Sequence, residues 1–138
     1  MTEAGIRGLV IDASAVVALL TDDSATGRWV ADVVTGRSLG APELMPFEAA
    51  NILRRLALSG VIDATAATLA HADLLDLTVD LVPWRLLAGR AWELRANLTV
   101  YDAAYVALAE ALEVPFLTLD GRIARAADVR CPVLTPPS

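Results

Sequence analysis

The chain has 138 residues, of which 56% are hydrophobic and 20% charged, and its formal net charge is −6. This length and apolar content suit one compact domain over residues 1–138, with a core large enough to need no disulfide or structural metal. The acidic balance argues against broad nonspecific binding to nucleic acid, and the single copies of cysteine and histidine, Cys131 and His71, exclude an internal disulfide and a Cys/His zinc site within one chain.

Charged residues interrupt each apolar run well before the roughly 18 residues needed to span a bilayer. We therefore expect a cytoplasmic protein without a membrane segment. All eleven basic residues are arginine. Guanidinium groups suit bidentate contacts with phosphate, although a solvated helix face explains most such residues equally well. The arginines that fall near the candidate site described below are Arg54, Arg55, Arg122 and Arg125.

The first third of the chain alternates between strand and helix patterns. Residues 8–11 form an apolar run that ends at Asp12 and continues into "ASAVVALL", which predicts a buried strand followed at once by a helix. A second helix is predicted over 26–35, with Gly36 as its stop. Residues 38–42 form a short strand at best.

The middle of the chain is mainly helical in pattern. Pro46 suits the first turn and Gly60 the end of a helix of about four turns. Further elements follow the same signals of apolar period and capping residues. We expect a helix from residue 63, a strand over 78–83, and helices over 86–96 and 99–113.

The last elements are short. "PFLTLD" at 115–120 predicts a strand, "GRIARAAD" at 121–128 a short helix, and "PVLTP" at 132–136 a final strand. Strands that alternate with helices predict an α/β fold with a parallel sheet. No linker or repeat indicates a second domain.

Two nearly identical hexapeptides, "VIDASA" at 10–15 and "VIDATA" at 61–66, place an aspartate before a helix. Asp12 follows a strand, and functional groups of open parallel sheets gather outside the carboxyl ends of the strands. Asp63 follows Gly60 by only two residues, too few for a strand, so we expect it to act only as an N-cap.

Asp120 shares the strand-end position of Asp12, but both have structural alternatives. Asp12 or Ser14 would cap the following helix, and Asp120-Gly121 is a common turn dipeptide. Taken singly, neither aspartate distinguishes a catalytic from a structural role.

Two further acids border apolar helices. Glu48 lies at the edge of the apolar stripe of its helix, beside Arg55, and an ordinary boundary glutamate is the alternative. Asp102 begins a nearly all-apolar helix, and with Thr99 it has the spacing of a capping box. Because clustered carboxylates in apolar surroundings require cations, the joint pattern favours an oxygen-ligated Mg²⁺ or Mn²⁺ that activates water for phosphodiester cleavage.

The residues around these acids resemble a known family. The segments "LVIDASAVVALL", "PELMPFEAANILRR", "LTVYDAAYVALAEAL" and "FLTLDGRIARAA" are similar in order and interval to the four acidic motifs of the PIN domain, and within it to the VapC-type toxins of bacterial toxin–antitoxin pairs. The resemblance runs the full length of the chain. It implies a PIN-like three-layer α/β fold, in which helices flank a short-stranded parallel central sheet.

The resemblance also implies a function and a site. The family consists of Mg²⁺-dependent endoribonucleases that usually form homodimers and are silenced by a VapB-type antitoxin whose tail occupies the groove of the active site. Carried over residue by residue, the acidic metal site and its polar supports would be Asp12, Glu48, Asp102 and Asp120, with Ser14 and Thr118. Mn²⁺ is the expected substitute for Mg²⁺. For a homodimer surface, the candidates are Trp84, Trp92 and the first two helices.

Two other function classes compete with this interpretation. A phosphoryl-transfer protein would also place an aspartate after the first strand, but it usually needs a lysine, and this chain has Ser14 where a second acid would stand and no lysine at all. The other alternative is a PIN-like module that binds RNA or a partner without cutting. The RNA substrate, its cleavage sequence, the number of ions and the antitoxin are not readable from the sequence.

Overall fold

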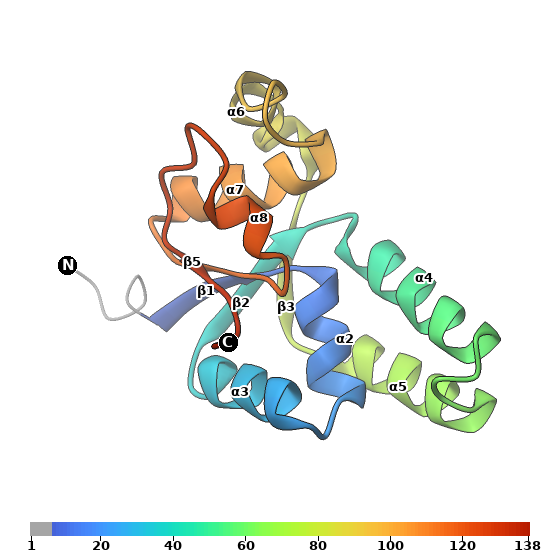
Figure 1. Cartoon of the computed structure of the whole chain (residues 1–138). Coiled ribbons are helices and arrows are strands. Elements are labelled where there is room, and N and C mark those ends of the chain that lie inside the picture. The colour runs from blue at the N-terminus through green and yellow to red at the C-terminus, as the bar shows by residue number, and fades with distance from the viewer. Residues whose placement is uncertain (1–6) are drawn as a thin grey trace.

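The computed structural model describes residues 7–138, and its centre is a five-stranded sheet in the order β3-β2-β1-β4-β5. Every neighbouring pair of strands is parallel. This confirms the predicted α/β fold with a parallel sheet (Figure 1). The strands are β1 (Gly8–Ile11), β2 (Ser38–Pro42), β3 (Val79–Val82), β4 (Phe116–Leu117) and β5 (Val133–Leu134).

Helices cover both faces of this sheet and give the three layers (Figure 1). On one face, α7 (Val100–Leu112) packs on β1, β2 and β4, and α6 (Ala88–Glu93) packs on α7. Residues 103–109 of α7 are all buried, as the apolar composition of this helix predicts. On the other face lie α2 (Ala13–Thr21) and α3 (Ala25–Val34), the latter followed by Gly36 at φ 75°.

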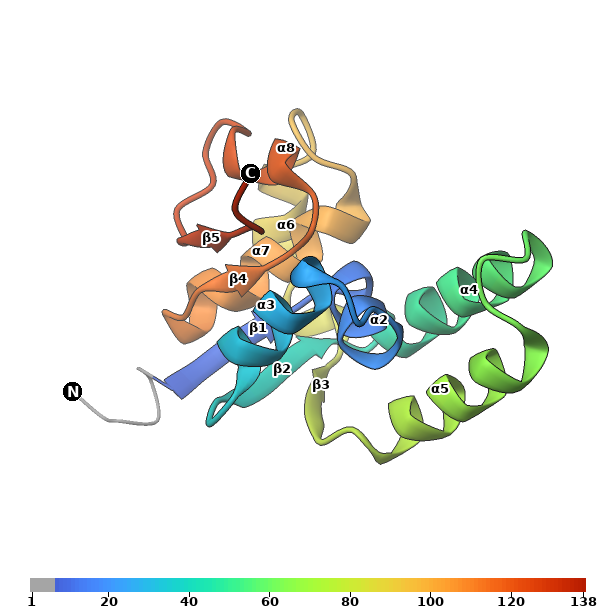
Figure 2. The ribbon, with the colours of Figure 1, turned by 60° about the horizontal axis from the view of Figure 1, so that its bottom comes forward.

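The helices α4 (Met45–Leu58) and α5 (Ala64–Asp76) form a hairpin that extends away from the sheet (Figure 2). Gly60, with φ 79°, lies in the turn between them, as expected for the end of α4. Both helices pack against α2, and α2 also packs against α3. The contacts with α3, α4 and α5 cover much of the apolar surface of α2, and the expectation that the first two helices form part of a dimer surface stays a prediction.

Three predicted elements differ most from the observed ones, and all three are longer than observed. The helix expected over 86–96 is the shorter α6, which follows a 3₁₀ turn at Trp84–Leu86. It ends at Glu93 because the backbone after Trp92 tightens into three-residue hydrogen bonds such as Arg95 N to Trp92 O at 3.2 Å. The strand expected over 115–120 ends at Leu117, where the loop begins to bond to the segment after β1. The helix expected over 121–128 is α8 (Gly121–Ala124).

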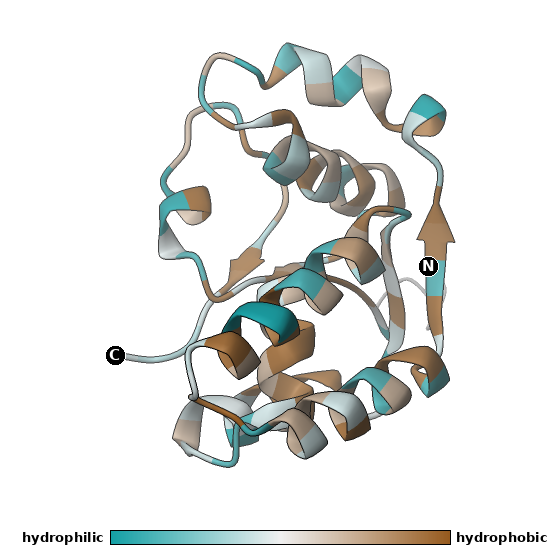
Figure 3. Ribbon diagram, turned by 90° about the vertical axis from the view of Figure 1, so that its right-hand side faces the viewer, coloured by the Kyte–Doolittle hydropathy of each residue, from teal (hydrophilic) through white to brown (hydrophobic). Residues whose placement is uncertain are grey.

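Figure 3 shows the apolar character of β3, which forms one edge of the sheet.

Within residues 7–138 there is no helix long and apolar enough to span a membrane. The expectation of one domain over 1–138 includes residues 1–6, which lie outside the described residues, and it stays a prediction.

Candidate functional site

All four predicted acids line one cavity of about 320 Å³. Since β1 and β4 are neighbours in the sheet, the loops that follow them meet at the same edge, and the first turns of α4 and α7 close the cavity from the sides. The cavity is lined by Asp12, Ala13, Ser14, Glu48, Asn51, Ile52, Arg55, Asp102, Tyr105 and Asp120. The sequence thus identified acids that lie far apart in the chain and that the fold brings together.

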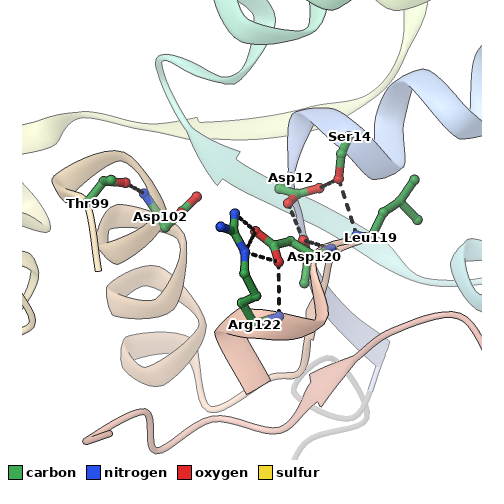
Figure 4. A network of polar contacts seen from close by, with 8 residues as sticks. Asp12, Ser14, Thr99, Asp102, Leu119, Asp120 and Arg122 are labelled. Atoms are coloured by element: carbon green, nitrogen blue, oxygen red, sulfur yellow. Dashed lines mark hydrogen bonds and ion pairs between the residues drawn. The ribbon is translucent and has the colours of Figure 1, made fainter. Parts of the chain in front are cut away.

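Asp12 is the most enclosed of these acids, with 8% of its surface exposed. Its Oδ1 accepts hydrogen bonds from Ser14 Oγ at 2.6 Å and Ala15 N at 3.0 Å, and its Oδ2 accepts one from Thr118 Oγ1 (Figure 4). Burial raises the pKa of Asp12, and these hydrogen bonds oppose the rise. Because a carboxylate has about four acceptor positions, Oδ2 keeps one for a further ligand.

Ser14 and Thr118 join the two strand-end loops. Ser14 Oγ accepts a hydrogen bond from Leu119 N at 3.2 Å, and Thr118 Oγ1 accepts one from Asp120 N at 3.0 Å. Thr118 is fully buried, so its hydroxyl has a fixed set of partners. The two residues predicted as polar supports therefore fix Asp12 relative to the segment that carries Asp120.

Glu48 is held by a residue that the sequence analysis missed. Its Oε1 accepts a hydrogen bond of 2.6 Å from the hydroxyl of Tyr105, whose ring stacks on Phe116 with a centroid distance of 5.6 Å. Partial burial raises the pKa of Glu48, and the Tyr105 hydrogen bond lowers it. The sequence signal was present, because Tyr105 lies three residues after Asp102 and thus on the same face of α7.

Asp102 lies in the first turn of α7. Its backbone N–H donates to Thr99 Oγ1 at 3.2 Å, so Thr99 is the N-cap, as the spacing of the two residues predicts. The carboxylate of Asp102 lines the cavity. Burial raises the pKa of Asp102, and the charge of Asp120 raises it further.

Asp120 differs from the other acids because a cation already contacts it. Arg122 Nη2 lies 2.7 Å from Asp120 Oδ2, and Arg122 Nε donates to Asp120 Oδ1 at 3.0 Å (Figure 4). The Arg122 guanidinium lowers the pKa of Asp120. Asp120 also caps α8 by accepting from Arg122 N at 3.0 Å, so its expected turn role and its place in the cavity are both observed.

The donor set of this cavity fits a hard divalent ion, because its acids offer only oxygen ligands, as Mg²⁺ and Mn²⁺ prefer. In the part of the chain that the structure describes, no three acidic, histidine or cysteine side chains already enclose an ion position. Glu48 is bonded to Tyr105, and Asp120 is paired with Arg122. Since Mg²⁺ keeps several water ligands, it does not require a closed protein cage.

The second aspartate of the repeated hexapeptide has no place in this cavity. Asp63 accepts a hydrogen bond from Ala66 N at 2.7 Å and caps α5, as predicted. Asp12 caps α2 in the same way, through Ala15 N. The two aspartates share the capping role, but only Asp12, which follows β1, also lines the acidic cavity.

Two other lining residues, Asn51 and Arg55, come from α4. They lie three and seven residues after Glu48, a spacing that places all three on one helix face. The shared edge of Glu48 and Arg55 was expected, whereas Asn51 was missed.

Comparison with known proteins places the chain in a family. The PIN domain model matches residues 9–129. Ribonuclease VapC9 of Mycobacterium tuberculosis is 38% identical over 129 residues, which cover 94% of this chain and 98% of that protein.

Two solved structures share the fold. Mycobacterium tuberculosis VapC20, a sarcin-ricin loop cleaving toxin, matches with a TM-score of 0.64 at 20% identity, over 88% of this chain and 98% of that one. A chain of VapBC2 from Rickettsia felis, bound to a DNA fragment from its promoter, matches with a TM-score of 0.65 at 8% identity, over 93% of this chain and 98% of that one. The conclusion from sequence and fold is that this chain belongs to the PIN-domain family and, within it, to the VapC ribonucleases.

Proposed function

We propose that this protein is a Mg²⁺-dependent endoribonuclease that hydrolyses RNA phosphodiester bonds as the toxin of a toxin–antitoxin pair. The observation that carries the proposal is the convergence of Asp12, Glu48, Asp102 and Asp120 on one open cavity. Burial raises the pKa of the first three, so their ionised forms are destabilised in the folded chain. A divalent cation supplies a compensating charge.

In the proposed reaction, Asp12 and Asp102 would hold the ion, while Glu48 and Asp120 would complete its surroundings and orient water. When bound, the ion lowers the pKa of its water and neutralises the charge that develops on the phosphate. The protein fixes the positions of the carboxylates. Asp12 is fixed through both carboxylate oxygens, and Glu48 is fixed by Tyr105.

The substrate we propose is single-stranded RNA. The acids line an open cavity at the sheet edge, and a splayed, flexible backbone reaches such a cavity more easily than a paired one. Arg55 and Asn51, which line the same cavity from α4, are placed to bind phosphate and base or ribose groups. The cytoplasm is the compartment that we propose, in keeping with an RNA target.

For the partners, we propose a VapB-type antitoxin and a second copy of this chain. The antitoxin is supported by the α4–α5 hairpin, which extends away from the sheet (Figure 2) and whose helix α4 lines the acidic cavity. This hairpin exposes several large apolar side chains. These side chains are Phe47, Leu58, Val61, Leu69 and Leu75. The homodimer is supported by an apolar cavity of about 250 Å³ that is lined in part by Trp84, Leu87 and Tyr101. Trp92, the other tryptophan predicted for the dimer surface, is also exposed, and Arg95 lies over its ring.

The deciding experiment is incubation of the purified protein with RNA in Mg²⁺, and then in excess chelator. We expect cleavage with Mg²⁺ or Mn²⁺, none with chelator, and a loss of about 100-fold or more in Asp102→Asn, which removes one ligand charge. Asp63→Asn is the matched control, because it makes the same change at a helix N-cap outside the cavity. RNA binding without cleavage under all these conditions would instead support the non-catalytic binding module.

A further inference from the structure

A second cavity adjoins the acidic one and shares two of its walls. It measures about 220 Å³ and is lined by Asn97, Leu98, Thr99, Asp102, Asp120, Arg122 and Ile123. Asp102 and Asp120 line both cavities. An RNA strand bound over the acids can therefore continue into the second cavity. The mechanism proposed above uses none of its other residues.

The cation of this cavity is Arg122. Its side chain is 82% exposed, and its guanidinium folds back from α8 onto Asp120 with Nη2 at 2.7 Å and Nε at 3.0 Å (Figure 4). A fork that fits a carboxylate also fits a phosphate, because both present two oxygens in one plane. An ion pair this exposed contributes little stability, so the transfer of the guanidinium from Asp120 to a phosphate requires little free energy.

The remaining walls suit a nucleotide rather than a bare anion. The side-chain amide of Asn97 has no hydrogen-bond partner within residues 7–138, and the Thr99 hydroxyl accepts from Asp102 N while its own proton stays available. Leu98, which is partly buried, and Ile123, which is almost fully buried, form the apolar side of the cavity. Amide, hydroxyl and apolar contacts are those by which proteins bind the base and ribose of unpaired RNA.

We propose that this second cavity is a nucleotide subsite, in which Arg122 binds the backbone phosphate next to the one that is cleaved, and Asn97 contacts the attached nucleoside. The subsite rests on the ribonuclease function proposed above and adds to it the direction in which the RNA leaves the acids. Asp120 is the internal anion that holds Arg122 in place until the RNA phosphate replaces it.

The test is RNA binding rather than cleavage. Asp12→Asn serves as the parent, so that a labelled single-stranded RNA oligonucleotide stays intact, and its Kd is measured across a range of salt concentrations. Adding Arg122→Gln should weaken binding roughly tenfold and make the slope of log K against log salt shallower by about 0.7, the value for one lost phosphate contact on a single strand. Arg122→Lys should keep the slope and lose part of the affinity, because it keeps the charge without the fork.

Two other variants complete the design. Arg28→Gln on α3 makes the same charge change away from both cavities and should leave Kd and slope unchanged. Asn97→Ala should weaken RNA binding without a change in slope, whereas an effect of Arg122 alone would point to a phosphate site without a nucleoside contact and would overturn the subsite.

The outcomes separate this inference from the proposed function. If the parent binds RNA and Arg122→Gln matches it in both Kd and slope, the subsite is wrong and the ribonuclease proposal stands. If the parent does not bind RNA and the wild-type chain does not cleave it, both are wrong.

Discussion

The hydroxyl of Tyr105 on α7 donates a hydrogen bond of 2.6 Å to Oε1 of Glu48 on α4, and so joins two helices across the acidic cavity. This hydrogen bond affects the ionisation of Glu48. It lowers the pKa of Glu48, which partial burial raises. Tyr105 therefore favours the ionised form of Glu48 and fixes its position.

Tyr105→Phe tests this role. Phenylalanine keeps the ring that stacks on Phe116 and removes the hydroxyl, so we expect a loss of stability of about 1 kcal/mol. Without the hydrogen bond the pKa of Glu48 rises, and the acid limb of the rate profile should move to higher pH. The measurement is the rate of RNA cleavage from pH 5 to 8, and superimposable profiles for the two proteins would contradict the assignment.

Thr118→Val should separate the buried hydroxyl from the shape of the side chain. The hydroxyl donates to Asp12 Oδ2 and accepts from Asp120 N, so its removal leaves two groups without a partner and should cost about 1–3 kcal/mol. Mn²⁺ affinity, measured by titration calorimetry, should fall with it. Thr118→Ser keeps the hydroxyl and should retain affinity; equal loss in both variants would show that packing, not hydrogen bonding, is responsible.

The buried acids give a defined dependence of stability on pH. The folded pKa values of Asp12, Glu48 and Asp102 are raised, so the folded chain binds these protons more tightly than the unfolded chain. At pH above the raised pKa values, these three acids therefore destabilise the folded chain. This destabilisation disappears at pH below the ordinary pKa values of 3.8 for aspartate and 4.5 for glutamate. Asp120 acts in the opposite sense, because Arg122 lowers its pKa: its stabilisation is present above 3.8 and is lost as pH falls through the lowered value.

Asp12→Asn removes one of these unfavourable contributions while it keeps a residue suited to cap α2. In chelator, we expect a higher Tm than wild type at pH 7, with a difference that shrinks as pH falls toward 4. Thermal unfolding at constant ionic strength measures both. A variant that is less stable than wild type at pH 7 would show that the three hydrogen bonds to Asp12 outweigh its burial.

Divalent ions should stabilise the wild-type chain, because they bind the folded acids and neutralise their repulsion. At a free Mn²⁺ concentration 100 times its Kd, the expected gain is about 2.7 kcal/mol. Tm is followed against MnCl₂ and MgCl₂, with ionic strength matched by a monovalent salt. The gain should be much smaller in Asp102→Asn, and an identical gain in the two proteins would place the ion elsewhere.

Replacement of the two capping aspartates by alanine should have different effects on stability and on cleavage. Asp63→Ala removes the bond to Ala66 N and Asp12→Ala the bond to Ala15 N, each at a cost of about 0.5–2 kcal/mol. For Asp12→Ala, relief of the buried charge offsets this cost. RNA cleavage should survive in Asp63→Ala and disappear in Asp12→Ala; an inactive but folded Asp63→Ala protein would remove the distinction.

The sequence by itself determined the class of fold and the identity of the acids. Apolar runs and helical periods are local properties, so β1, α2, α4 and α7 were predictable from their own residues. The boundaries failed where tertiary contacts override local preference. Residues 118–120 carry a strand pattern, but the Thr118 hydroxyl donates to Asp12, Leu119 N donates to Ser14, and Asp120 N donates to Thr118 Oγ1, so β4 ends at Leu117.

Only the tertiary structure decided which partners the acids have. The Tyr105–Glu48 bond joins two residues that are 57 positions apart in the chain, and no local period reports such a pair. Likewise, "VIDASA" and "VIDATA" give their aspartates the same capping geometry, and the sheet decides the rest. Asp12 lies after β1 and beside the loop that follows β4, where burial removes water from its charge, whereas Asp63 lies in an exposed turn between two helices.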